Sequence, residues 1–189
     1  MSSEKNHLIN EAITYATACH AGQVRKGSCH PYILHPLETM LILFHMNADD
    51  NLLIAGVLHD IVEDTPATLE EICDRFGSDV ASLVAFHTED KSRGWTERKS
   101  AAIASLSGAG DREMMLILAD KVSNLRSSIS DYREIGEQFW DKFNARREQQ
   151  NWYYMKMFDA LKPMESHPAA SPYYREMKDL LSHLFSGRS

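Results

Sequence analysis

The stretch AGVLHDIVEDT, residues 55–65, most constrains how this chain can fold. Its small and apolar residues have the pattern of a helix buried in a core, yet four of its side chains are ionisable: His59, Asp60, Glu63 and Asp64. A core does not accept unpaired charges, because removing a charge from water is costly unless it is paired or bound to a metal. The sequence therefore predicts a core in which charged groups from several segments meet.

The rest of the chain has a helical pattern. Apolar residues recur at helical spacing almost throughout, and the alternation typical of strands is hard to find. Thr68 and Glu71 form a capping-box pattern, and Gly77 separates two short helices. We expect an all-α protein with helices at 4–21, 36–47, 49–63, 68–75, 77–87, 95–107, 111–130, 136–161 and 170–186. No repeat or linker divides the sequence, so we expect one domain over 1–189, with an extra C-terminal helix at about 170–186.

The composition narrows the classes of partner. A net charge of −7 argues against binding to nucleic acid, and no apolar run is long enough to span a membrane. The first ten residues do not resemble a signal peptide, and three cysteines without CxxC spacing suit a reducing cytoplasm. Basic residues gather at 25–26, 90–99, 120–126 and 141–147, which leaves room for an anionic small molecule. Solvated helix faces are the other interpretation of these runs.

Two residues elsewhere in the chain are candidate partners for the charged stretch. His35 lies just before Pro36, where a helix can begin with proline in its first turn. Asp120 interrupts the apolar run MMLILADKVSNLR. Taken alone, His35 could instead cap or pack a helix, and Asp120 could form an ion pair with Lys121 or Arg126.

Placed on one helix, His59 and Glu63 share a face, and the adjacent Asp60 can reach the same ion from the flank. Imidazole and carboxylate groups together suit a divalent ion such as Mn²⁺, Fe²⁺ or Zn²⁺. Such an ion needs further protein ligands, for which His35 and Asp120 are available. The sequence thus predicts a metal site in the core.

The order His…His-Asp…Asp resembles the HD superfamily of metal-dependent phosphohydrolases. Four longer segments are similar to the hydrolase domain of RelA/SpoT homologues: HAGQVRKGSCHPYILHPLE, GVLHDIVEDT, RFGSDV and ILADKVSNLR. The similarity runs from about residue 7 to 161 and leaves no room for the synthetase and regulatory domains of the long members. The chain therefore looks like a stand-alone small alarmone hydrolase with the HD-domain helical bundle.

The resemblance implies a Mn²⁺-dependent guanosine-3′,5′-bis(diphosphate) 3′-pyrophosphohydrolase, which removes pyrophosphate from the 3′ position of the nucleotide. The implied ligands of one Mn²⁺, or of another divalent ion, are His35, His59, Asp60 and Asp120. Glu63 and Asp64 match the catalytic pair of the family. A bound metal makes water a usable nucleophile, whose proton Glu63 can take. Asp64 could position that water or assist the leaving 3′-oxygen.

Arg25 and Lys26 match the family's substrate-contacting pair. An arginine plane can stack on a purine, whereas a lysine meets phosphate as a point charge. The loop between Lys26 and His35 differs in length from the long enzymes and lies near the base in the family. The preference for guanosine or adenosine therefore stays open.

Three further residues match substrate contacts of the family. Asn124 follows Asp120 by one helical turn and could reach the ribose or the phosphates. Lys99 and Tyr153 match phosphate contacts, although Lys99 could be a solvated helix lysine and Tyr154 could face inward in place of Tyr153.

Two other functions stay open at this point. One keeps the enzyme class and changes the substrate: another HD nucleotidase or phosphodiesterase, or a hydrolase that prefers (p)ppApp. The other is a catalytically silent HD module that binds an alarmone. Such a module would have lost Glu63, Asp64 or a metal ligand, and none of them is lost.

Overall fold

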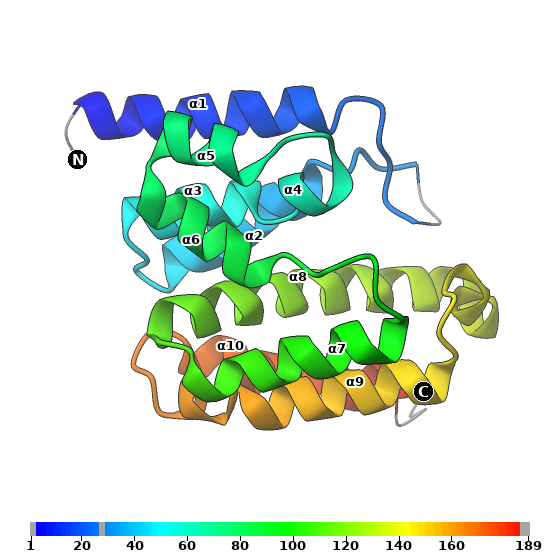
Figure 1. Ribbon diagram of the computed structural model, residues 1–189. Coiled ribbons are helices and arrows are strands. Elements are labelled where there is room, and N and C mark those ends of the chain that lie inside the picture. The colour runs from blue at the N-terminus through cyan, green and yellow to red at the C-terminus, as the bar shows by residue number, and fades with distance from the viewer. Residues whose placement is uncertain (1–2, 27–28, 186–189) are drawn as a thin grey trace.

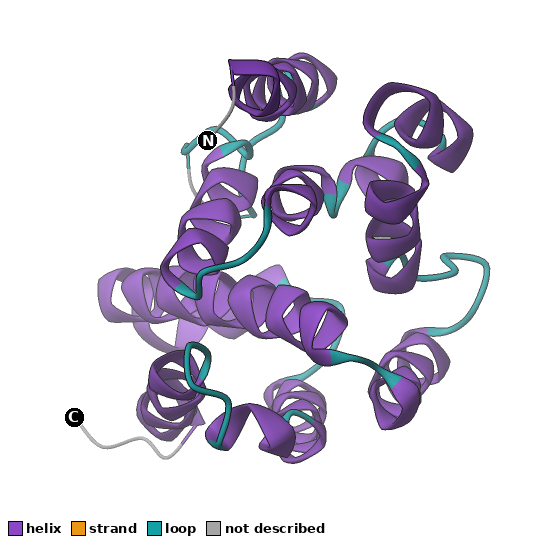
Figure 2. Ribbon diagram, turned by 90° about the vertical axis from the view of Figure 1, so that its left-hand side faces the viewer, coloured by secondary structure: helices purple, strands orange, loops and turns teal. Residues whose placement is uncertain are grey.

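The computed structural model describes residues 3–26 and 29–185. Within these ranges the chain is built of helices joined by loops, with one isolated antiparallel bridge between Val24 and Pro31 (Figure 2). The predicted all-α class is confirmed. No helix in this part of the chain is long and apolar enough to cross a membrane. Residues 27–28, in the loop between Lys26 and His35, lie outside the described residues.

A long helix, α8 (Asp111–Ile135), crosses the middle of the molecule, and the other helices lie on its two sides (Figure 1). One side holds α1 (Ser3–Cys19), α2 (Leu34–His45), α3 (Asp50–Leu58), α4 (Ile61–Asp64), α5 (Leu69–Phe76) and α6 (Ser78–His87). The other side holds α7 (Trp95–Ser105), α9 (Arg147–Ala160) and α10 (Ser171–Phe185). Short 3₁₀ segments lie at Leu106–Gly108, Gly136–Lys142 and Lys162–Glu165.

Local sequence signals account for several helix ends. The Thr68 side chain accepts from the Glu71 backbone N–H (3.2 Å), and the Glu71 carboxylate accepts from the Thr68 N–H (2.9 Å), so the predicted capping box is confirmed. Asp49 caps α3 by accepting from Leu52 N (3.0 Å). Gly77 separates α5 from α6 with a φ of +90°, a conformation that other residues rarely adopt.

Close packing of α2 on α3 brings two site histidines together. A Cβ added at Gly56 would lie 2.6 Å from Leu43 Cδ1, so the absence of a side chain at Gly56 lets Leu43 pack directly on α3. The first turn of α2, which carries His35, then lies beside the residue that follows α3, His59. The two rings meet edge to face with centroids 5.0 Å apart.

The single helix predicted over 49–63 is wrong. The chain turns at His59 and Asp60, between α3 and α4. His59 Nδ1 lies 2.8 Å from the Gly56 carbonyl oxygen, and this side-chain bond competes with the backbone bond that would continue the helix. As a result the His59 ring is fully buried, while Glu63 lies in the wall of a pocket.

The helix predicted over 136–161 is also wrong. Gly136, with a φ of +62°, ends α8 well beyond its predicted end at 130, and a 3₁₀ segment and a loop precede α9. Aromatic packing replaces helical periodicity here, because the ring of Phe139 lies 4.9 Å from that of Trp140 and 5.1 Å from that of Phe143. The predicted C-terminal helix is α10, which packs on α8, and this contact supports our proposal that the chain forms one domain.

Candidate active site

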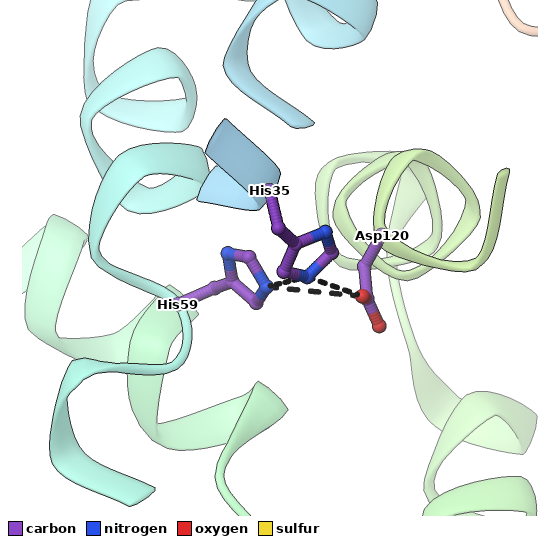
Figure 3. A group of neighbouring side chains, drawn as sticks. All are labelled: His35, His59 and Asp120. Atoms are coloured by element: carbon purple, nitrogen blue, oxygen red, sulfur yellow. Dashed lines mark hydrogen bonds and ion pairs between the residues drawn. The ribbon is translucent and has the colours of Figure 1, made fainter. Parts of the chain in front are cut away.

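The side chains predicted to bind a metal converge in the core between α2, α3 and α8, and Figure 3 shows three of them: His35, His59 and Asp120. The Nε2 atoms of His35 and His59 lie 3.1 Å apart, and Asp120 Oδ1 lies 3.2 Å from the first and 3.8 Å from the second. Asp60 Oδ2 lies 3.4 Å from His35 Nε2 and 3.1 Å from His59 Nε2. Each aspartate oxygen thus lies within 3.8 Å of both histidine nitrogens in a largely buried place.

The outer hydrogen bonds of the two rings determine which nitrogen can bind a cation. The Gly56 carbonyl can only accept, so His59 Nδ1 carries a proton. Ser123 Oγ donates to Glu38 Oε2 (2.8 Å) and therefore accepts from His35 Nδ1 (2.8 Å). When the two rings are neutral, the Nε2 lone pair of each ring therefore points toward the other ring. Two converging lone pairs beside two carboxylates fit a divalent cation.

The pKa values report the same concentration of negative charge. Burial lowers the pKa of His59, but Asp60 and Asp120 outweigh burial and raise it to about 9. Burial raises the pKa of Asp60, yet the charge of His59 holds it well below its usual range. Asp120 behaves similarly, with Lys121 as the main opposing charge. A field that favours a proton on His59 also favours a metal cation at this position.

The ion pair proposed for Asp120 is present with one of the two candidates. Lys121 Nζ lies 2.5 Å from Asp120 Oδ2. Arg126 instead binds Glu38 (3.0 Å) and Glu176 (2.7 Å), which joins α8 to α2 and α10. Because His35 and the other cluster atoms approach Asp120 from the opposite oxygen, the pair with Lys121 does not displace them.

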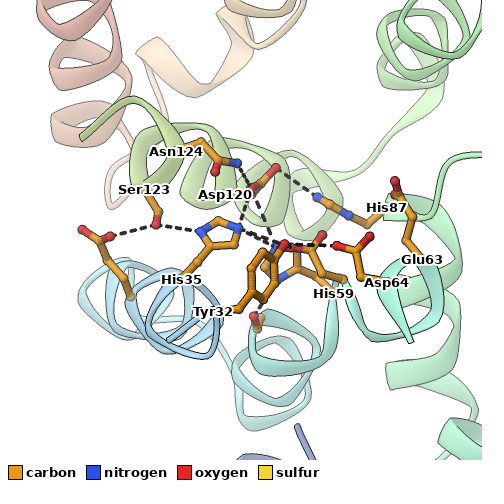
Figure 4. Close-up of polar contacts among 12 residues, drawn as sticks. Tyr32, His35, His59, Glu63, Asp64, His87, Asp120, Ser123 and Asn124 are labelled. Atoms are coloured by element: carbon orange, nitrogen blue, oxygen red, sulfur yellow. Dashed lines mark hydrogen bonds and ion pairs between the residues drawn. The ribbon is translucent and has the colours of Figure 1, made fainter. Parts of the chain in front are cut away.

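Sequence reasoning missed His87 and Tyr32. His87, which the sequence did not single out, is nearly buried with its Nε2 3.1 Å from Asp120 Oδ2 (Figure 4). Tyr32 donates its hydroxyl to Asp60 Oδ2 (2.6 Å) and lies 3.2 Å from Asp64 Oδ2. Proximity to His35 in PYILH was a signal for Tyr32, whereas nothing in the spacing of His87 indicated its place.

A pocket of about 450 Å³ lies beside the cluster. Its lining includes six cationic side chains: Arg25, Lys26, Lys91, Arg98, Lys99 and Lys121. Three carboxylates also line it: Glu63, Asp64 and Asp131. A chain with a net charge of −7 thus has a local excess of positive charge, which suits a polyanionic ligand. A hollow of about 590 Å³ between α8 and α10 contains none of the predicted site residues.

The two predicted catalytic carboxylates lie in the pocket wall. Burial, followed by the charges of Asp60 and Glu89, raises the pKa of Glu63 above its usual value. The Asp64 carboxylate is held by Lys91 Nζ at 2.7 Å, and the same ammonium group lies 3.8 Å from Glu63 Oε1. The raised pKa gives Glu63 the properties of a proton acceptor, whereas Asp64 is the more exposed and better-paired acid.

Two of the predicted substrate residues, Arg25 and Asn124, are connected to the metal-ligand cluster by hydrogen bonds. Arg25 Nη2 donates to Asn124 Oδ1 (3.0 Å), and Asn124 Nδ2 donates to Asp120 Oδ1 (2.5 Å). Lys26 is exposed at the pocket rim. Arg25 and Lys26 therefore lie where they can contact one ligand, and Asn124 connects that ligand site with the cluster.

On the opposite wall, Tyr153 is buried and faces the pocket, although Tyr154 also lines it. The ammonium groups of Lys99 and Lys121 lie 4.9 and 5.7 Å from the centre of the Tyr153 ring. Lys99 is not a solvated helix lysine, because its Nζ lies 2.7 Å from Glu89 and the side chain is only 20% exposed.

Comparisons with known proteins show the family of the chain. The HD domain family model matches residues 12–149. The guanosine-3′,5′-bis(diphosphate) 3′-pyrophosphohydrolase MESH1 of Drosophila melanogaster is 39% identical over 129 residues, which are 67% of this chain and 72% of that protein. A GTP pyrophosphokinase of Myxococcus xanthus is 36% identical over 129 residues, which are 66% of this chain. The matched region is only 16% of that relative's length. A solved metazoan orthologue of SpoT that hydrolyses ppGpp and plays a role in starvation responses matches with a TM-score of 0.77 and 30% identity, over 95% of this chain and 96% of the other.

Proposed function

The chain belongs to the HD domain family, and from this premise we propose that it is a metal-dependent hydrolase that removes pyrophosphate from the 3′ position of (p)ppGpp. One observation carries the proposal: two histidines and two aspartates converge in the core beside a pocket lined by six cationic side chains. The names of the relatives support the same substrate, a small nucleotide with several phosphates. We also infer a cytoplasmic location, because the three cysteines lack the spacing of a disulfide framework.

The proposed metal ligands are His35, His59, Asp60 and Asp120, which would hold one divalent ion. We propose Mn²⁺, because a mixed set of imidazole nitrogens and carboxylate oxygens suits an ion of intermediate hardness. A divalent ion bound here would supply a Lewis acid and lower the pKa of water toward neutrality.

Glu63 and Asp64 are proposed to perform the proton transfers. Glu63 lies in the pocket wall next to the cluster, and its raised pKa suits a group that takes a proton from the attacking water. Asp64 is fixed by Lys91 and by the Tyr32 hydroxyl, so it can orient the water or the leaving 3′-oxygen. Tyr32 donates to Asp60 as well, so its hydroxyl links Asp64 to one of the proposed metal ligands.

Substrate binding is assigned to the cations of the pocket. Arg25 presents a planar group beside Asn124 and can stack on the purine, while Lys26 meets phosphate at the rim. Lys99 lies over Tyr153 on the opposite wall, within the same pocket. The two walls are thus proposed to bind opposite ends of the nucleotide.

The experiment is incubation of the chelator-treated protein with ppGpp or ppApp, with and without Mn²⁺. We expect pyrophosphate and GDP from ppGpp only when the metal is present, and faster turnover than with ppApp. Faster turnover of ppApp would assign the enzyme to adenosine alarmones. Tight binding of ppGpp without any release of pyrophosphate would support the silent module in place of a hydrolase.

A further inference from the structure

His87 is a buried histidine that the proposed mechanism does not use. It is the last residue of α6, and its side chain is 7% exposed. The ring packs edge to face on His59 with centroids 4.6 Å apart. One of its ring nitrogens lies within 4.8 Å of potential ligand atoms of His59 and Asp60. Burying a polar ring is costly unless its nitrogens form hydrogen bonds, so the contacts of His87 with the cluster indicate a role there.

The hydrogen bonds of His87 determine its tautomer. Nε2 lies 3.1 Å from Asp120 Oδ2, a carboxylate oxygen that can only accept a hydrogen bond. Nδ1 is buried and has no hydrogen-bond partner among the described residues. A proton on Nδ1 would leave a buried donor unpaired and set the Nε2 lone pair against a carboxylate oxygen. The proton therefore lies on Nε2 and is donated to Asp120.

We propose that His87 is a positioning residue of the metal centre, which holds Asp120 by Oδ2 so that Oδ1 faces His35 and His59. The inference rests on the proposed function only in that the cluster binds a divalent ion. A carboxylate that is bound at one oxygen cannot rotate freely, and fixing a ligand in this way typically improves metal affinity 10–100-fold.

Lys121 also contacts Asp120 Oδ2, but it cannot replace His87. Its ammonium group lies in the lining of the cation-rich pocket, where a polyanionic substrate competes with Asp120 for it. His87 does not line this pocket and has no such competitor. Of the two donors to Oδ2, His87 is therefore the one that stays in place when a nucleotide binds, whereas Asn124 donates to the other oxygen, Oδ1.

Two substitutions of equal polarity and different reach test this role. The amide nitrogen of glutamine can occupy the place of histidine Nε2, whereas that of asparagine reaches only the place of Nδ1. His87→Gln should bind Mn²⁺ within about threefold of the parent, and His87→Asn should bind it roughly 10–100-fold more weakly. The measurement is calorimetric titration of the metal-free protein with Mn²⁺, with His45→Asn, an exposed histidine of α2, as the control.

The same variants distinguish the positioning role from its alternatives. Parent-like affinity in His87→Asn would reduce His87 to a packing residue and overturn the inference. Equal loss in both variants, with a changed visible spectrum of the Co²⁺-loaded protein, would make His87 a direct ligand and also overturn it. If the parent itself does not bind Mn²⁺, the proposed metal centre fails first, so the two failures are distinguishable.

Discussion

The buried cluster and the rim of the pocket beside it hold charged side chains in opposite ways. In the cluster, short side chains on packed helices face one another at 3.1–3.8 Å, and Asp120 is only 2% exposed. At the rim, the long side chain of Lys91 pairs with Asp64, which lines the same pocket. The exposed fraction of the Lys91 side chain is 52%.

This difference determines how strongly each charged side chain depends on its particular partner. A buried charge has no water to compensate it, so each cluster residue depends on specific partners, and removing one partner has a large effect. A rim cation is screened by water and salt and can exchange one anionic partner for another. We expect substitutions in the cluster to change metal binding or turnover by orders of magnitude and those at the rim to change substrate affinity several-fold.

The largest effect is expected for Asp120→Asn, which removes the carboxylate that faces both histidine Nε2 atoms. The variant should bind Mn²⁺ at least ~100-fold more weakly and keep most of its helicity, because the apolar faces of the helices are unchanged. Elemental analysis and circular dichroism check this, with Asp111→Asn, at the exposed start of α8, as the control. Equal metal content in variant and parent would remove Asp120 from the ligand set.

Glu63→Gln tests a residue that lies between the buried cluster and the pocket rim. The substitution keeps the shape and removes the proton acceptor, so turnover should fall by about 10²–10⁴ with a smaller change in KM and normal metal content. Steady-state kinetics beside Glu70→Gln, an exposed residue of α5, gives the comparison. A large rise in KM at unchanged turnover would instead make Glu63 a substrate contact.

Ser123→Ala tests the hydrogen bond to His35 Nδ1, the ring nitrogen that points away from the cluster. Without the hydroxyl, His35 Nδ1 loses its acceptor and Glu38 loses a donor, so the ring is no longer held in one tautomer. Mn²⁺ affinity should fall about tenfold. The matched control is Ser128→Ala on the same helix, whose hydroxyl bonds only to the Asn124 carbonyl in the described structure. Equal calorimetric affinity in the two variants would mean that packing alone orients the ring.

At the rim, Lys26→Ala and Arg25→Lys should weaken substrate binding for different chemical reasons. Lys26→Ala removes an exposed charge and should weaken substrate by about fivefold, more at low salt and more for substrates with more phosphates. Arg25→Lys keeps the charge but loses the plane and the bond to Asn124, so the loss should appear for every purine nucleotide.

Steady-state kinetics at low and moderate salt distinguish the two rim variants, with Lys178→Ala, exposed on α10, as the control. Parent-like kinetics for Arg25→Lys would exclude stacking by Arg25 and leave it as one of the phosphate-attracting cations.

The smallest effect is expected for Asp79, an exposed acid that belongs to neither region. Hydrogen bonds from Arg112 and Asn51 lower its pKa to about 2. A folded pKa below the unfolded value stabilises the protein above the unfolded pKa, and this contribution is lost as the pH falls through about 2. Asp79→Asn should therefore lower stability at pH 6 by about 0.5 kcal/mol or less. Urea unfolding at pH 6 and pH 2, beside Asp74→Asn, checks that the difference disappears in acid.

Much of the candidate site could be predicted from the sequence because its signals are local. Ionisable residues inside apolar helical runs, such as His59 and Asp120, are costly unless they meet, and the structure brings them together. Helical periodicity was sufficient for the all-α class for the same reason, since it depends on neighbours three or four positions apart. It failed at 59–60 and 136–146, where a side-chain hydrogen bond, a left-handed glycine and packed aromatic rings outweigh propensity.

By itself the sequence determined the helical class, the histidine and aspartate cluster, and the acidic pair beside it. Only the tertiary structure decided which residues surround them. His87 reaches Asp120 across 33 positions, and Tyr32 reaches Asp60 across 28. Such contacts depend on how α2, α3, α6 and α8 pack, and a close approach at Gly56 helps to set that packing. Because no local pattern encodes the angle and spacing between helices, these partners became visible only when the helices were assembled.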